Sequence, residues 1–158
     1  MNVGKVMGGG IVVIAVVAGL AMYWLQEYAF YAEAVFRPGE EIRLTLIDRD
    51  QPEPILVEGV IGIDASSSPL RFRACFTTPM GLPLMTETYK VYDGAEPLNA
   101  PSWFDCFDAE AIGKALETGA ALAFLSEANI APSVDRVVAV FPDGRAFAWH
   151  QLSPEAAE

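Results

Sequence analysis

One stretch near the start of the chain is long and apolar enough to cross a membrane. Residues 6–25 read VMGGGIVVIAVVAGLAMYWL and contain 20 residues without a charged side chain. A helix rises about 1.5 Å per residue, so this stretch covers about 30 Å, the thickness of a bilayer's hydrocarbon core. Tyr23 and Trp24 lie at its end, where amphipathic rings favour the headgroup region. The pattern therefore predicts a transmembrane helix.

A cleaved signal peptide is the alternative interpretation of this stretch. Ala32-Glu33-Ala34 imitates a cleavage site, but it lies nine residues after the apolar run. The run is also longer than the roughly 7–15 residues of a signal-peptide core. We therefore expect an uncleaved anchor, and the aromatic residues that follow predict an interfacial extension of the helix over residues 26–35.

The few charges around this helix predict its orientation. Lys5 and the amino terminus are the cations before it, whereas Glu27 and Glu33 follow it directly. Because positive charge stays on the cytoplasmic side, we expect residues 1–5 in the cytoplasm and the rest of the chain in the periplasm of a bacterium.

Small residues form a second pattern in the apolar stretch. They let helix backbones approach closely in lipid, which would give a lateral contact with another membrane helix. Glycine is also common in isolated transmembrane helices, so the pattern alone leaves both interpretations open. The candidate contact residues are Gly4, Gly8, Gly9, Gly10, Ala15 and Gly19.

The remainder of the chain consists of short apolar segments separated by turns. Residues 42–47, 55–63 and 70–77 have strand-like patterns, with a bulge expected at Gly59 or Gly62 in the second. We expect these segments to form a three-stranded antiparallel meander. A further strand is predicted over residues 86–92.

The second half of this region predicts a helix and a hairpin. Asp108 can cap a helix over residues 109–117. Residues 120–128 fit either a helix or a strand. Asp143-Gly144 lies between two apolar segments, which is typical of a tight β-hairpin.

Together these elements predict the α+β class. One N-terminal transmembrane helix is followed by a small antiparallel-sheet domain with one or two helices. The domain is expected over residues 36–152, with a tail at 153–158.

Composition and charge limit the function of this domain. The chain has 158 residues and a net charge of -11, and every acidic residue lies after Leu25. Such a balance argues against a nucleic-acid partner, because phosphate binding requires clustered cations. The acidic surface would instead attract a basic periplasmic electron carrier such as a c-type cytochrome.

Cys75 and Cys106 are the two cysteines. Outside the cytoplasm an even number favours a disulfide, although two buried free thiols are the alternative. A bridge between them would stabilise the fold by about 3–4 kcal/mol through restriction of the unfolded chain.

Other polar residues give no pattern typical of catalysis. His150 is the single histidine and has no nearby nucleophile or orienting acid in the sequence, so we expect no catalytic, cofactor or metal site. Arg71 and Arg73 are expected on the polar face of a strand, paired with carboxylates, with anion or lipid-headgroup binding as the alternative.

One aromatic and acidic segment is a candidate docking edge. Aromatic residues are enriched at interface cores, but the same residues also suit core filling before the predicted helix. The candidate docking residues are Trp103, Phe104, Asp105 and Asp108.

The opening MNVGKVMGGGIVVIAVVAGLAMYWLQEYAFYAEA, with RFRACFTTP and SWFDCFDAE, resembles an uncharacterised family of small single-span proteins from alphaproteobacteria. The resemblance implies a Gram-negative inner membrane and a periplasmic domain. It implies no activity, cofactor or catalytic residue.

The leading functional hypothesis is a noncatalytic accessory subunit of a larger inner-membrane complex, of the respiratory or photosynthetic electron-transfer type. Its expected partners are the lipid bilayer and other membrane-protein subunits. The alternatives are an assembly or maturation factor for such a complex, and an acidic docking module for a cationic carrier.

Overall fold

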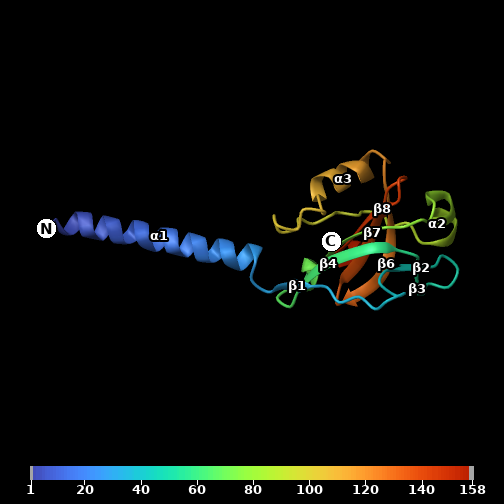
Figure 1. Cartoon of the computed structure of the whole chain (residues 1–158), viewed down its shortest axis with the longest axis horizontal. Coiled ribbons are helices and arrows are strands. Elements are labelled where there is room, and N and C mark those ends of the chain that lie inside the picture. The colour runs from blue at the N-terminus through green and yellow to red at the C-terminus, as the bar shows by residue number, and fades with distance from the viewer. Residues whose placement is uncertain (1, 157–158) are drawn as a thin grey trace.

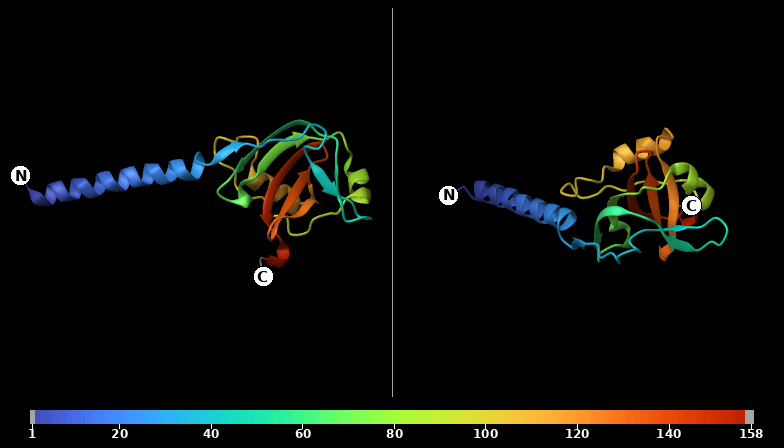
Figure 2. Two further views of the ribbon diagram at one scale, coloured as in Figure 1. Left: turned by 90° about the horizontal axis from the view of Figure 1, so that it is seen from below. Right: turned by 45° about the vertical axis from the view of Figure 1, so that its right-hand side comes forward.

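The chain begins with one long helix that stands apart from the rest of the molecule. In the computed structural model, which describes residues 2–156, helix α1 (Val3–Glu27) buries none of its residues. It projects from one end of the domain as an isolated rod (Figures 1 and 2). Its length and composition suffice to cross a membrane, and N-terminal signal sequences share this property. Helix α1 is therefore a membrane anchor or a signal sequence.

Helix α1 ends earlier than the sequence predicts. The expected extension over residues 26–35 is wrong beyond Glu27, because Phe30 adopts a left-handed φ of +71° and turns the chain out of the helix. Strand β1 (Tyr31–Glu33) follows at once and pairs antiparallel with strand β4 (Glu58–Ala65). The sheet thus gains an edge strand from residues that precede the expected start of the domain.

Six antiparallel strands form the main sheet in the order β1-β4-β5-β8-β7-β6. Its remaining members are β5 (Arg73–Thr77), β6 (Leu122–Ala131), β7 (Val134–Val140) and β8 (Arg145–Leu152). Residues 122–131 are therefore a strand, which settles the ambiguous segment. The predicted α+β class is confirmed.

Two local predictions in this sheet are confirmed as well. The register between β4 and β5 shifts between Glu58 and Ile61, and Gly59 has a φ of +62°, so the bulge lies where glycine permits it. Strands β7 and β8 form the predicted hairpin, in which Gly144 has a φ of +90°.

The predicted three-stranded meander is wrong in its first member. Strand β2 (Arg43–Thr45) pairs with strand β3 (Pro52–Pro54) in a separate two-stranded ribbon and not with β4. The third member also begins late, because the short 3₁₀ helix η1 (Pro69–Arg71) occupies the start of the expected strand.

Helix α2 (Leu82–Thr88) replaces the first three residues, 86–88, of the strand predicted over residues 86–92. Gly81 precedes it, and Pro83 lies in its first turn, where a missing N–H is tolerated. Met85 is fully buried and fixes the helix to the domain. Only residues 89–92 remain extended, with single bridges from Tyr89 to Leu46 and from Val91 to Phe124.

The main sheet is covered on both faces. The ribbon β2–β3 and helix α2 pack on one face, around Leu44, Phe124 and Val138. Helix α3 (Ala109–Glu117) and the loop before it cover the other face, around Ile112 and Trp149. Figure 1 shows α3 and the ribbon on opposite sides of the sheet. Since both faces of the sheet are covered, β5 and β7 are buried along nearly their whole length, polar residues included.

Both of the expected terminal tails contain helical residues in the structure. Of the expected tail at residues 153–158, the short 3₁₀ helix η2 (Pro154–Ala156) is described, and residues 157–158 lie outside the described part. At the other end α1 already begins at Val3 within the expected tail 1–5, and Met1 lies outside the described part.

Candidate functional site

The C-terminal end of α1 is held by the loop that precedes α3. The Glu27 carboxylate accepts hydrogen bonds from the backbone N–H and the hydroxyl of Ser102, at 2.8 and 2.9 Å. The indole N–H of Trp103 donates to the main-chain carbonyl of Glu27. The last carbonyls of a helix have no partner within it, so the indole satisfies one of them. We call Glu27, Ser102 and Trp103 the junction; Figure 1 shows this yellow-to-gold loop reaching toward α1.

Aromatic rings surround the junction. The ring of Tyr28 stacks on that of Trp103 with centroids 6.4 Å apart, and Tyr31 meets Trp103 edge-on at 5.8 Å. Phe104 also meets the indole edge-on, with ring centroids 6.3 Å apart. Trp103 nevertheless keeps 38% of its surface exposed.

The same loop is fastened to the sheet by a disulfide. Cys75 on β5 and Cys106 are bonded, with their Cα atoms 6.3 Å apart, so the predicted bridge is confirmed. Such bridges persist in oxidising compartments, which points to a domain outside the cytoplasm.

A buried arginine fixes the beginning of this loop. The Arg73 guanidinium donates to the carbonyls of Leu98 at 2.8 Å and Asn99 at 2.9 Å, and also to those of Leu70 and Phe72. The expected pairing of Arg73 with carboxylates on an exposed face is wrong, because the loop covers that face of the sheet. Burial lowers the pKa of Arg73 to about 10.

The four predicted docking residues do not form one exposed surface. Phe104 belongs to the core beneath the loop. The side chain of Asp108 accepts a hydrogen bond from the backbone N–H of Ala111 at 3.0 Å and caps α3, as predicted. Asp105 is exposed, and Trp103 lies against the end of α1.

The predicted helix-contact residues divide into two groups. With 3.6 residues per turn, Gly4, Gly8, Ala15 and Gly19 fall within about 60° of one another around the helix axis. Gly9 and Gly10 point to other sides of α1. We call the first four the small-residue stripe. No other part of the described chain buries it, since none of the residues of α1 is buried.

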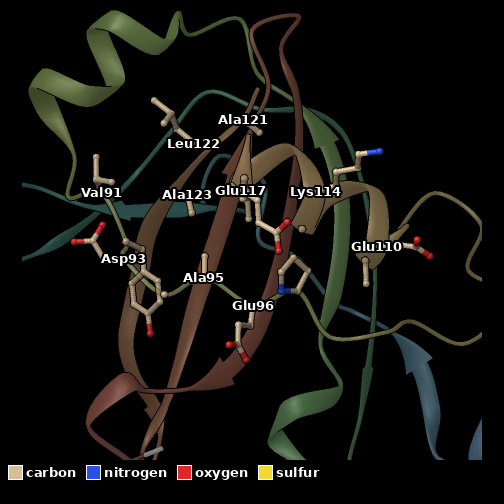
Figure 3. A pocket seen from close by; sticks show the side chains of 16 residues that line it. Val91, Asp93, Ala95, Glu96, Glu110, Lys114, Glu117, Ala121, Leu122 and Ala123 are labelled. Carbon is tan, nitrogen blue, oxygen red and sulfur yellow. The ribbon is translucent and has the colours of Figure 1, made fainter. Parts of the chain in front are cut away.

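A groove of about 880 Å³ lies between α3 and residues 91–97 (Figure 3). Alanines line its floor, and most of the charged residues around it are acidic. Figure 3 shows Glu117 directed into the space between α3 and residues 95–96, whereas Lys114 points away. The charged lining residues are Asp93, Glu96, Glu110, Lys114 and Glu117. The only signal in residues 93–102 is the prolines and the glycine typical of a loop, so the groove could not be found from the sequence.

The groove offers carboxylates and an apolar floor. The hydroxyl of Tyr92, which also lines it, donates to Asp135 at 2.9 Å, and burial together with this bond raises the pKa of Tyr92. The phenol of Tyr92 therefore stays protonated, and its hydroxyl proton is already used in the bond to Asp135. Among residues 2–156, no group of three or more His, Cys, Asp or Glu side chains is placed to hold a metal ion. Because its charged lining is mostly acidic, the groove favours cationic over anionic groups.

His150 lies away from the groove in a packed interior position. Its ring stacks on Phe72 with centroids 4.6 Å apart, and the Arg136 guanidinium lies 4.2 Å from the centre of that Phe72 ring. Burial lowers the pKa of His150 to about 4, and the positive charge of Arg136 adds to this effect.

Comparison with known proteins identifies a family for most of the chain. A model of a family described as a family of unknown function, DUF6446, matches residues 42–158. The helix α1 and strand β1 precede the matched residues. No curated protein and no solved structure matches the chain.

Proposed function

The chain belongs to DUF6446, a family of unknown function, and from its own structure we propose that it is a noncatalytic accessory subunit of a larger inner-membrane complex. In this proposal α1 is retained as the anchor, its N-terminus is cytoplasmic, and the domain is periplasmic. The host is an assembly of the respiratory or photosynthetic electron-transfer type.

The observation that carries the proposal is the isolation of α1. None of its residues is buried by the domain, yet it bears the small-residue stripe along one side. Apolar side chains gain little from meeting one another in lipid, whereas small residues let two backbones pack closely. A stripe of this kind supports a neighbouring helix supplied by another subunit.

The proposed compartment has separate support. The disulfide between Cys75 and Cys106 suits an oxidising environment. Lys5 before the apolar stretch, with Glu27 and Glu33 after it, favours a cytoplasmic N-terminus.

The test is co-purification from detergent-solubilised native membranes with a matched pair of variants. In Gly8→Ile the stripe is blocked, and in Gly10→Ile the same side chain lies about 200° further round the helix. A Cβ at either position meets nothing within 4 Å outside the local helix backbone, so the rest of the chain crowds neither position.

We expect the wild type and Gly10→Ile to recover the same subunits in fixed stoichiometry, and Gly8→Ile to lose them. Recovery of the wild type without any stoichiometric partner would overturn the proposal. Equal recovery of partners by both variants would show that the stripe is not the contact.

An assembly or maturation factor would use the same helix contact transiently. Its partner would then be found in incomplete complexes and be absent from the finished one. Quantifying the chain in both fractions separates this role from that of a stable subunit.

The acidic groove favours a second candidate function, docking of a cationic carrier such as a c-type cytochrome. Opposite charges steer such encounters, and salt screens them. Binding should therefore weaken as salt rises, and it should weaken more in Glu96→Gln/Glu117→Gln than in the control Glu40→Gln/Glu41→Gln, which removes equal charge outside the groove. Affinity that does not change with salt would contradict this role.

A further inference from the structure

Three exposed aromatic residues lie where α1 meets the domain. Tyr28 and Phe30 follow directly on the helix, and Trp103 reaches the same place from the loop before α3. We call them the aromatic collar. In Figures 1 and 2 this loop and β1 form the end of the domain nearest α1.

The collar has a defined depth if α1 spans the bilayer. Glu27 lies two residues beyond Leu25, the end of the apolar stretch, which is about 3 Å along the helix axis. The headgroup layer on each side of the hydrocarbon core is about 5–7 Å thick. The indole N–H of Trp103 bonds to the carbonyl of Glu27, so the ring is tied to this layer.

The collar residues expose apolar surface that the domain leaves uncovered. Phe30 is 58% exposed although its neighbour Ala29 is buried. Phe30 also holds a left-handed backbone conformation, which is costly for a bulky residue. The exposed ring lies three residues after the end of α1.

We propose that the aromatic collar inserts into the lipid headgroup layer and seats the domain directly on the membrane surface. Indole and phenol rings favour this layer because they combine an apolar body with a polar edge. The proposal rests on the retention of α1 in the membrane. The aromatic collar then gives the domain a second membrane contact and a fixed orientation on the bilayer.

Neutral lipid is the appropriate partner for this surface. Glu27 lies within the junction, and the chain carries a net charge of -11, so anionic headgroups gain no attraction here. Phosphatidylcholine vesicles are therefore the probe, and the purified full-length protein is reconstituted in them without other subunits.

The three tryptophans supply the test and its controls. Trp24 lies in the apolar stretch, Trp103 in the collar, and Trp149 is completely buried in the core. Emission is measured from Trp24→Phe, from Trp24→Phe/Trp103→Phe and from Trp103→Phe, in vesicles with or without lipid brominated near the headgroup. Trp149 stays in every variant, and its shielded emission reports that the domain remains folded.

We expect bromination to quench the Trp103 contribution, which is obtained from the difference between the first two variants. An unchanged difference would overturn the seating of the collar. Trp103→Phe reports on Trp24, and Trp24→Phe reports on Trp103. If Trp24 is quenched and Trp103 is not, the collar does not insert, whereas α1 is still in the membrane. If Trp24 itself escapes quenching, both the anchor and the inference fail.

Discussion

The Nε2 atom of His150 accepts a hydrogen bond from the Nε–H group of Arg136 at 3.0 Å. The Nδ1 atom of the same ring lies 2.6 Å from the carbonyl oxygen of Pro69. A carbonyl can only accept, so Nδ1 carries the ring proton and the imidazole is neutral. A second proton on Nε2 would point at the positively charged Arg136 guanidinium. Nε2 could then no longer accept the hydrogen bond from Arg136.

This arrangement predicts that the protein loses stability in mild acid. The pKa of His150 is about 4 in the folded chain against an ordinary value of 6.5, so only the unfolded chain gains the proton between these values. The contribution of His150 is complete above pH 6.5, falls as the pH drops to about 4, and is then constant. The loss is on the order of 3 kcal/mol.

The measurement is urea unfolding of the full-length protein in mild detergent across this pH range. The control is His150→Gln, which cannot titrate. Carboxylates titrate in both proteins, so the difference between the two curves isolates His150. Parallel curves between pH 6.5 and pH 4 would contradict the prediction.

Reduction of the disulfide should weaken the folded domain. Cys75 and Cys106 are 31 residues apart, and opening a loop of this size costs about 3–4 kcal/mol through the unfolded chain. The free energy of unfolding should fall by this amount when reductant is added to the wild type. The variant Cys75→Ala/Cys106→Ala should show no response to reductant, and an equal response in both would refute the assignment.

Two neighbouring aspartates should differ in their effect on stability. Asp108→Ala removes the cap on the N–H of Ala111 and should cost about 1 kcal/mol. Asp105→Ala removes the same charge from an exposed position and should change stability by less than about 0.5 kcal/mol. The free energies of unfolding of the two variants are compared at one ionic strength. Equal losses of stability would contradict the role of Asp108 as the cap.

Glycines at two turns should respond differently to alanine. Gly119 has a φ of +73° with open space around it, so Gly119→Ala should cost only the backbone strain of about 1–2 kcal/mol. A Cβ at Gly144, where φ is +90°, would lie 2.8 Å from the carbonyl oxygen of Thr78. The additional crowding should bring the loss for Gly144→Ala to about 2–4 kcal/mol. Thermal or urea unfolding of both variants tests the ranking.

Local signals explain what could be predicted from the sequence. The Asp143-Gly144 turn and the Asp108 cap act within a few residues, so the hairpin and α3 follow from them directly. The disulfide required only the count of cysteines and the compartment.

Long-range contacts explain what could not be predicted. Glu27 and Ser102 are in contact although they are 75 residues apart in the chain, and no local sequence pattern predicts such a contact. Alternation over residues 86–92 suggested a strand, but burial of Met85 favours the helix α2 there. Arg73 lies on the expected side of β5, yet the loop that covers it comes from residues 98–99.

Strand β1 has a practical consequence for anyone who wishes to cut the domain free of its helix. It occupies the outer side of β4, where Tyr31 pairs with Ala65 and the N–H of Ala34 bonds to the carbonyl of Gly62. A fragment that starts at residue 42, where the family match begins, would lack β1. The main-chain N–H and C=O groups on the outer side of β4 would then have no strand to pair with. An unpaired edge strand can form hydrogen bonds with the same edge of another chain and so cause aggregation. A soluble fragment should therefore begin no later than Ala29.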